Sequence, residues 1–396
     1  MGVPNGSTVR WFHSDMPGAP QNNALAGDYI AILDACLVNG FDQKNVDSLV
    51  VASDVATVTI DGGHDYEKHA VIRIAGATPA ELNGDWRIAT ADATTFTFAT
   101  TGIADGAATG TITAIRATPG YWEKSFSGTN KAAYRSIHED ASGCYFRIDD
   151  NPTGHAPILI RAYEAMTDVD TGTRPFPTFA QLAENSYQWR KLSTTSSAVL
   201  PRPWIIVADE SFFWFFSAFL STDSHNDRKV SYFFGDIARF NPADVYACVV
   251  GGHGTASTHT SHRPDSLFDA ILVDGSATGC YFARNSANEA VDPVSFRRYG
   301  NARSPRLGGG SAFPDPVTQG YAFHYPILSA DDGIHYRGFT PGILQSLTHD
   351  SLTLDGDEYR VLDPSEAFTR AILLLGLGWT TASRAHVGVD IFGPWR

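Results

Sequence analysis

The feature that most constrains this chain is a series of short strand-like runs between residues 46 and 115. Runs rich in β-branched residues, such as 56–60, 70–74 and 95–99, alternate with clusters of Gly, Asp, Asn and Pro. Turn signals that recur about every 8–12 residues are typical of a small sandwich or barrel. The preceding residues supply one predicted strand and one predicted helix, which cannot form a core alone. We therefore expect 46–115 to be a small β-module inserted into a domain that the later sequence completes.

The segments that flank this module predict a β-rich body. Before it, residues 8–13 predict a strand, and residues 23–39 predict a helix with Leu25, Tyr29 and Cys36 on its apolar face and Gly40 as its end. After it, alternating runs predict antiparallel strands at 121–126, 131–136, 144–149 and 158–164. A short helix is predicted at 178–185.

Residues 203–218 predict a hairpin with an unusually aromatic second strand. Asp209-Glu210 forms the predicted turn, and five consecutive aromatic residues, 212–216, follow it. Since neighbouring side chains in a strand point to opposite faces, both faces are expected to be covered. One cover would be the domain core, and the other a further layer or a neighbouring subunit. Exposed aromatics that stack on sugars are the alternative.

The domain organisation follows from these patterns. We predict a mainly β protein, a multi-domain antiparallel body with few short helices and an inserted small β-sandwich. The expected boundaries are 1–45 plus 116–275 for the body, 46–115 for the module, and 276–396 for a C-terminal β-rich part. Two segments rich in Gly, Ser, Thr and Pro, 251–266 and 285–320, predict long loops that are typical of contact or functional regions.

Charge and cysteine usage limit the function classes. The net charge of −14 argues against nucleic-acid binding, and the small basic group predicts only loop charges or salt-bridge partners: Arg297, Arg298, Arg303 and Arg306. Cysteines 36, 144, 248 and 280 lack C-x-x-C spacing, so we expect buried free thiols in a protein made in a reducing cytosol. No signal peptide and no membrane span are predicted, because the apolar stretches are short or interrupted.

Two groups of residues could carry chemistry. A histidine-rich group could bind zinc or nickel, but its spacing matches no established motif, so polar loop or interface residues are favoured: His225, His253, His259, His262 and Asp265. Paired carboxylates could serve a glycosidase, yet most lie where Asp supports a turn: Asp149-Asp150, Asp168 with Asp170, Asp209-Glu210 and Asp331-Asp332.

Motifs for nucleophilic or nucleotide chemistry do not occur. The sequence has no G-x-S-x-G elbow and no P-loop, and the glycines 308–310 lack a predicted helix after them. We therefore predict a protein that is not an enzyme, with no catalytic, cofactor-binding or metal-binding residues and no cofactor.

Several stretches together resemble the minor tail or baseplate structural proteins of long-tailed bacteriophages. They are VRWFHS at 9–14, GATPAELNG at 76–84, WEKSFSGTN at 122–130, YEAMTDVDTG at 163–172 and DIFGPWR at 390–396. The module is similar to the immunoglobulin-like or fibre-associated domains that decorate such proteins. The resemblance implies a virion protein of the tail, assembled in the host cytoplasm, and carries over no functional residues.

Three functions remain open from the sequence. The first is a structural component of the tail tip or baseplate, present as a trimer or a hexameric ring, with other tail proteins and fibres as partners and a role in fibre attachment or host adsorption. The second is a receptor-binding protein that recognises a host surface glycan or pilus. The third is a glycan depolymerase, which would need two carboxyl groups about 5–9.5 Å apart in one groove.

Overall fold

The computed structural model describes most of the chain up to residue 254 and shorter pieces beyond it. The described residues are 7–151, 153, 157–191, 200–218, 229–254, 278–285, 289, 296–297, 323–324, 327–329, 336–346, 360–362, 370–377 and 385–396.

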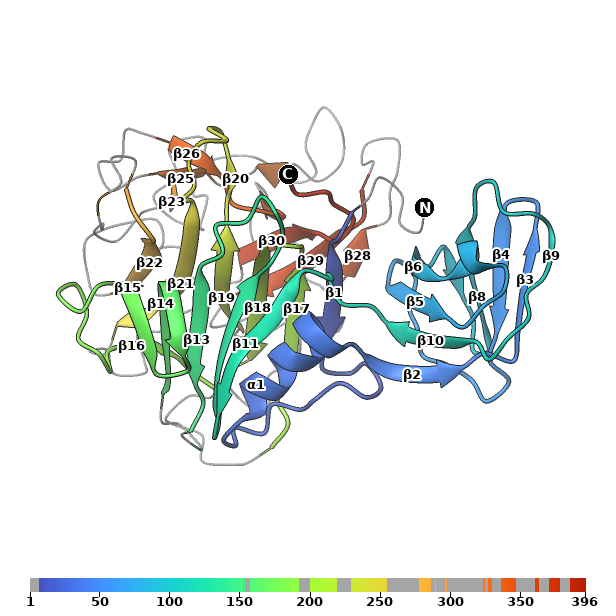
Figure 1. The fold of residues 1–396 in the computed structure, drawn as a ribbon, viewed down its shortest axis with the longest axis horizontal. Coiled ribbons are helices and arrows are strands. Elements are labelled where there is room, and N and C mark those ends of the chain that lie inside the picture. The colour runs from blue at the N-terminus through green and yellow to red at the C-terminus, as the bar shows by residue number, and fades with distance from the viewer. Residues whose placement is uncertain are drawn as a thin grey trace.

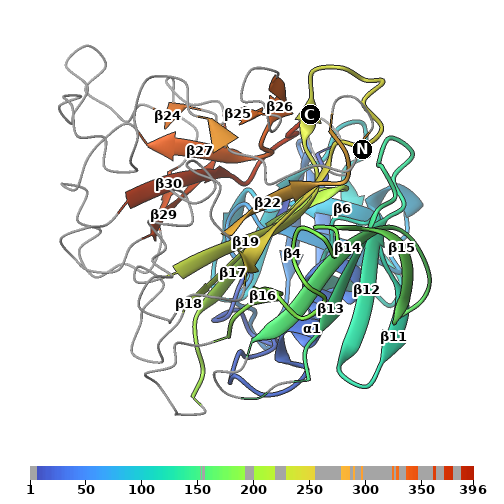
Figure 2. The same ribbon diagram turned by 90° about the vertical axis from the view of Figure 1, so that its left-hand side faces the viewer.

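The protein is mainly β, as predicted, with 49% of residues in strands and 6% in helices. Its largest sheet has twelve antiparallel strands (Figures 1 and 2). Their order is β1 (Arg10–His13), β17 (Trp204–Ala208), β18 (Phe212–Ala218), β19 (Lys229–Asp236), β21 (Cys248–Gly254), β16 (Tyr187–Trp189), β14 (Ile158–Asp168), β13 (Tyr145–Asp149), β12 (Lys131–Ser136) and β11 (Trp122–Gly128), while β15 (Thr171–Phe176) pairs with β14 and β22 (Thr278–Phe282) pairs with β21.

This sheet curls so that its two halves face each other across an aromatic core. The ring of Trp122 on β11 lies 5.4 Å from that of Phe213 on β18, and the ring of Phe146 on β13 lies 5.8 Å from it. The indole N–H of Trp122 also donates to the carbonyl of Asp209, at 2.8 Å. Packed sheet surfaces commonly lie about 10 Å apart, and large side chains from both surfaces fill the space between them.

Strand β18 is covered on both faces, as its consecutive aromatics predict. On the inner face, Phe215 packs against Tyr29 at 4.6 Å. On the outer face, the indole N–H of Trp214 donates to the carbonyl of Pro341, at 2.8 Å. The outer cover is a second layer of the same chain (Figure 2), a sheet of β24 (Phe323–His324), β27 (Ile343–Ser346), β30 (Ala385–Asp390), β29 (Ile372–Leu377) and β28 (Arg360–Leu362).

Residues on both sides of position 276 contribute to one hydrophobic core. Leu373 and Val389 of the second layer belong to the same buried cluster as the aromatics of β18. A further small sheet lies at the edge of the body and contains β20 (Ala238–Arg239), β26 (Tyr336–Phe339), β25 (Ile327–Ser329) and β23 (Phe296–Arg297).

The inserted module has two sheets and a core of its own (Figure 1, right). Trp86 stacks on Phe98 with ring centroids 4.6 Å apart, and Leu49, Val58 and Ile72 are buried with them. One sheet contains β2 (Phe41–Asn45), β10 (Thr113–Arg116), β5 (Val71–Ala75) and β6 (Gly84–Arg87). The other contains β7 (Thr90–Ala91), β8 (Thr95–Ala99), β4 (Val55–Thr59), β3 (Ser48–Ala52) and β9 (Gly106–Ala107), and a 3-10 helix η3 (Ala80–Leu82) precedes β6.

Two arginines connect the module to the body. Arg10 of the body is 4% exposed and donates to the Asp85 carboxylate of the module, at 2.9 Å. Arg87 of the module donates to the carbonyls of Ile391 and Phe392, at 2.9 and 3.2 Å, and lies over the Phe392 ring.

The helix predicted at 23–39 is shorter than expected. It consists of α1 (Asp28–Leu33) and the π-helical η2 (Asp34–Asn39), and it ends at Gly40, which has a φ of 72°. Gly27 has a φ of 86°, and the Asp28 carboxylate accepts the N–H groups of Asn23 and Leu25, so the first residues form a turn instead. Leu25 is therefore exposed, contrary to expectation.

The prediction of a helix at 178–185 is wrong, because these residues form turns. The guanidinium of the buried Arg161 donates to the carbonyls of Leu182, Ala183 and Glu184. These carbonyls accept hydrogen bonds from a residue of β14 that is distant in the sequence, and local sequence spacing does not reveal such a contact.

We predict that the body folds without the module. Replacing residues 46–115 by a short Gly/Ser linker should leave a cooperative thermal transition, because the module's buried cluster shares no residue with the main core. The deletion variant should be destabilised by about 1–3 kcal/mol, since Arg10 loses its charged hydrogen bond to Asp85.

Arg10→Met in the same deletion is the matched control. It removes the uncompensated charge, so it should recover part of the lost stability in urea unfolding. Loss of the cooperative transition in both proteins would show that the module is part of the main core.

Candidate functional site

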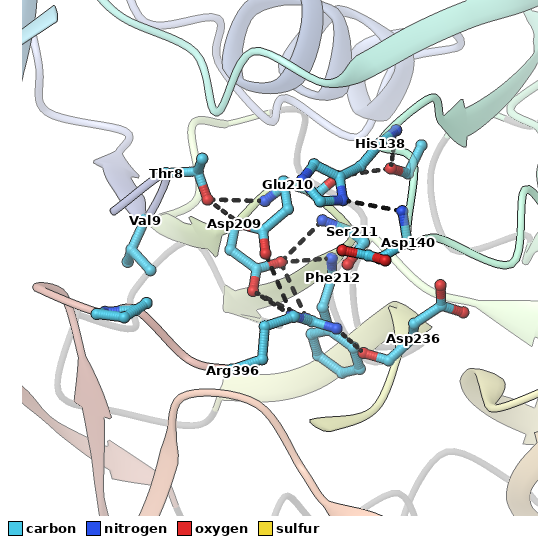
Figure 3. A network of polar contacts seen from close by, with 12 residues as sticks. Thr8, Val9, His138, Asp140, Asp209, Glu210, Ser211, Phe212, Asp236 and Arg396 are labelled. Atoms are coloured by element: carbon cyan, nitrogen blue, oxygen red, sulfur yellow. Dashed lines mark hydrogen bonds and ion pairs between the residues drawn. The ribbon is translucent and has the colours of Figure 1, made fainter. Parts of the chain in front are cut away.

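A pocket of about 850 Å³ opens where segments distant in the sequence meet. The turn between β17 and β18 forms part of its wall, together with the end of β19, the residues beside β11 and β12, and the segment 394–396. Its lining residues are Thr8, Tyr121, His138, Asp140, Glu210, Ser211, Asp236, Ile237, Ala238, Arg239, Phe240, Pro242, Phe339, Pro394, Trp395 and Arg396. Figure 3 shows the polar part of this site.

The floor of the pocket rests on an ion pair between Asp209 and Arg396. The Asp209 carboxylate accepts the backbone N–H groups of Ser211 and Phe212, at 2.9 and 2.7 Å, which fixes the turn. Arg396 Nη2 contacts its two oxygens at 2.8 and 3.2 Å, and Nε lies 3.1 Å from one of them. The Asp209 side chain is 1% exposed and that of Arg396 is 22% exposed, so the pair is largely shielded from water.

Burial sets the protonation behaviour of this pair. It raises the pKa of Asp209 from 3.8 to about 6, although the charge of Arg396 acts in the opposite direction. Burial disfavours the charged form of Arg396 too, but the carboxylates of Asp209 and Glu210 hold its pKa above the ordinary value.

Glu210 and Asp236 extend the network to other strands. Glu210 accepts a hydrogen bond from the Thr8 hydroxyl, and one of its oxygens lies 3.3 Å from Arg396 Nε. Asp236 is 4% exposed; its Oδ2 accepts the Ser142 N–H at 2.6 Å, and burial raises its pKa. Among the described residues, no group hydrogen-bonds to Asp236 Oδ1.

Exposed aromatic side chains lie around this polar floor. Tyr121 is 41% exposed, Phe240 51% and Phe339 38%. The Phe240 and Phe339 rings meet edge to face at 5.0 Å, and Tyr121 meets His138 in the same way at 4.7 Å. The site therefore combines apolar ring surfaces with charged groups of both signs.

Of the predicted carboxylate pairs that lie within the described residues, only Asp209-Glu210 is at this pocket. Asp150 lies elsewhere, fully buried in an ion pair with Lys191, and burial raises its pKa to about 6. Asp168 and Asp170 lie where β14 turns into β15, and Asp170 pairs with Lys131 and Arg147. Asp331 and Asp332 lie outside the described residues.

The predicted histidine group cannot be placed as a whole. The backbone of His253 belongs to β21, opposite Gln188 of β16, whereas His225, His259, His262 and Asp265 lie outside the described residues. Within the described ranges, no three His, Cys, Asp or Glu side chains are grouped as metal ligands would be. The four cysteines are buried free thiols, as expected.

Sequence reasoning missed the pocket itself. Three of its aromatic residues, Tyr121, Phe240 and Phe339, come from distant parts of the chain. Only the acidic turn at Asp209-Glu210 gave a signal, and that signal indicated a turn.

The chain matches no protein-family model and no curated protein. In the part of the chain that the structure describes, no helix has the length and apolar character needed to cross a membrane.

We predict that stability falls as the pH rises from about 4 to about 6. The pKa values of Asp150 and Asp209 are about 6 in the folded protein and 3.8 ordinarily, so the folded state binds protons more tightly in this range. Their stabilising contribution is full below about pH 4 and is lost as the pH passes about 6. Urea unfolding at several pH values across this window measures the slope.

Carboxylates with lowered pKa values, such as Asp85 and Asp170, act in the opposite direction at lower pH, so the comparison stays inside the window. Asp209→Asn should flatten the slope. A free energy of unfolding that rises steadily across the window would contradict the prediction.

Proposed function

We propose that the protein is a virion structural component of a phage tail tip or baseplate. It assembles around the tail axis by protein–protein contacts, as a trimer or hexameric ring, and supports fibre attachment or host adsorption. The stretches that resemble tail proteins suggest this class, and the surface of the inserted module is the observation that carries it.

The module presents a broad sheet face without a charged side chain. In register across β3, β4 and β8, the outward positions form three rows: Ser48, Thr59 and Thr95; Val50, Thr57 and Thr97; and Ala52, Val55 and Ala99. Val50 and Val55 are each 41% exposed. We call these nine residues the module face.

The composition of the module face suits a contact with another protein. Charged residues are depleted in the centres of protein interfaces, because burying an unpaired charge is unfavourable. The chain as a whole carries a net charge of −14, so a face of Thr, Val, Ala and Ser stands out from it. The strands at the edges of this sheet, β7 and β9, have two residues each, which limits pairing through the edge and leaves the face as the contact surface.

The contacts of Asp209 argue against a catalytic role for this carboxylate in glycan cleavage. Asp209 is held by Arg396 and two backbone N–H groups, so it serves the turn and the floor of the pocket. The receptor-binding alternative would place a host glycan in this pocket.

A charge on the module face should block incorporation into particles. Thr57→Glu lies at the centre of the face and points outward, so the monomer should keep its melting temperature within about 1–2 °C, as surface substitutions do. In a phage that encodes this chain, we expect at least tenfold less variant than wild-type chain in purified particles, measured by quantitative mass spectrometry.

Thr173→Glu on β15 is the control, because it is also an exposed strand threonine but belongs to the body. It should leave incorporation unchanged. Equal incorporation of both variants, or absence of the wild-type chain from the particles, would rule out this assembly surface.

A further inference from the structure

We propose that the pocket beside the Asp209–Arg396 pair binds a short neutral oligosaccharide. This inference goes beyond the assembly role and does not depend on it. Its basis is the combination of exposed rings, an unpartnered buried acceptor and charges of both signs in one cavity.

The exposed rings supply the surface on which a sugar stacks. Tyr121, Phe240 and Phe339 line the pocket and keep about two fifths to one half of their surface exposed. Because Phe240 and Phe339 meet at 89°, their planes offer two differently oriented apolar walls. The C–H faces of a pyranose ring pack against such walls, and an aromatic ring contributes a large contact area with little loss of side-chain freedom.

The floor supplies a hydrogen-bond acceptor that the protein leaves unused. Asp236 is 4% exposed and lines the pocket, and its Oδ1 has no hydrogen-bond partner among the described residues. A buried acceptor without a partner is unfavourable by about 1–3 kcal/mol. Because Oδ1 is closed to solvent, a small shift of the Asp236 side chain must accompany donation by a sugar hydroxyl, which would then remove this penalty.

The charges select a neutral ligand with both donors and acceptors. Asp140, Glu210 and Asp236 line the pocket together with Arg239 and Arg396. The guanidinium groups disfavour a cationic ligand, and the carboxylates disfavour an acidic sugar, because like charges repel. Hydroxyl groups can donate to the carboxylates and accept from Arg239, whose guanidinium already donates to the carbonyls of Asp140 and Asp244.

The size and rigidity of the pocket fit such a ligand. Its volume of about 850 Å³ lies within the range of about 300–1,000 Å³ that is common for small-molecule sites. The Asp209–Arg396 pair and the bond from Ser142 N–H to Asp236 hold the floor in place before any ligand enters. A preformed floor lowers the entropy cost of binding.

The test begins with a glycan array that carries neutral oligosaccharides of hexoses, deoxyhexoses and N-acetylhexosamines, with uronic-acid oligosaccharides for comparison. The full chain should bind a subset of the neutral glycans. The strongest binder is then titrated by saturation-transfer NMR against wild-type protein and three variants. Phe240→Ala and Asp236→Asn should each weaken binding at least tenfold.

Phe179→Ala is the matched control, because Phe179 is 49% exposed but does not line the pocket. It should bind like wild type. Asp236→Asn separates ligand binding from folding, since the amide oxygen can still accept from Ser142 N–H, so its melting temperature should be maintained while binding falls.

The proposal is overturned if no neutral glycan binds, if only acidic glycans bind, or if Phe240→Ala and Asp236→Asn both bind as tightly as wild type. Particle incorporation of Phe240→Ala should stay normal, so failure of the glycan proposal and failure of the assembly proposal give different results.

Discussion

The ion pair between Asp209 and Arg396 joins the turn between β17 and β18 to the segment 394–396, and both residues make further contacts within the body. Asp209 forms the turn between β17 and β18, and its carbonyl accepts from Trp122 at the far edge of the curled sheet. Arg396 also donates to the carbonyl of Asp236 at the end of β19, at 3.0 Å. Removing one partner of a buried pair is destabilising by about 3–5 kcal/mol, and the 22% exposure of Arg396 reduces that figure here.

The same turn closes the sheet. The Ser136 hydroxyl at the end of β12 donates to the carbonyl of Glu210, at 2.6 Å, and Thr8 contacts the Glu210 carboxylate. These bonds join the strands at one end of the large sheet, β1 and β17, to β12 near its other end. The inner-face aromatics of β18 are thereby enclosed. The pocket lies beside this closure, and residues 238–240 together with Phe339 of the small sheet complete its walls.

The sequence was informative wherever a structure depends on neighbouring residues. Alternation predicted β12 at 131–136, and the Asp209-Glu210 turn between two apolar runs predicted the β17–β18 hairpin. The run of aromatics predicted that both faces of β18 would be covered. Prediction failed where distant groups decide the local structure. Arg161 donates hydrogen bonds to the carbonyls of 182–184, where a helix was predicted. The Asp28 carboxylate holds residues 23–25 in a turn. The pocket could not be predicted for the same reason, since Tyr121, Asp236 and Phe339 meet only through sheet topology.

Two surfaces of the molecule suit two different contacts. The inserted module, which carries the module face, lies at one end of the molecule (Figure 1). The pocket lies on the body, lined by residues of β20 and of the segment 394–396. Their separation allows a protein contact through the module while the pocket stays open. An uncharged face suits a permanent contact, whereas rings and charged groups around a cavity suit reversible binding of a small polar ligand.

Cryo-electron microscopy of the tail end of a phage that encodes this chain tests the account most directly. With the chain traced in the density, we predict several symmetry-related copies around the tail axis, with the module face buried against another protein and the pocket open to solvent. A tail end that lacks this chain, or copies whose module faces point into solvent, would contradict the account.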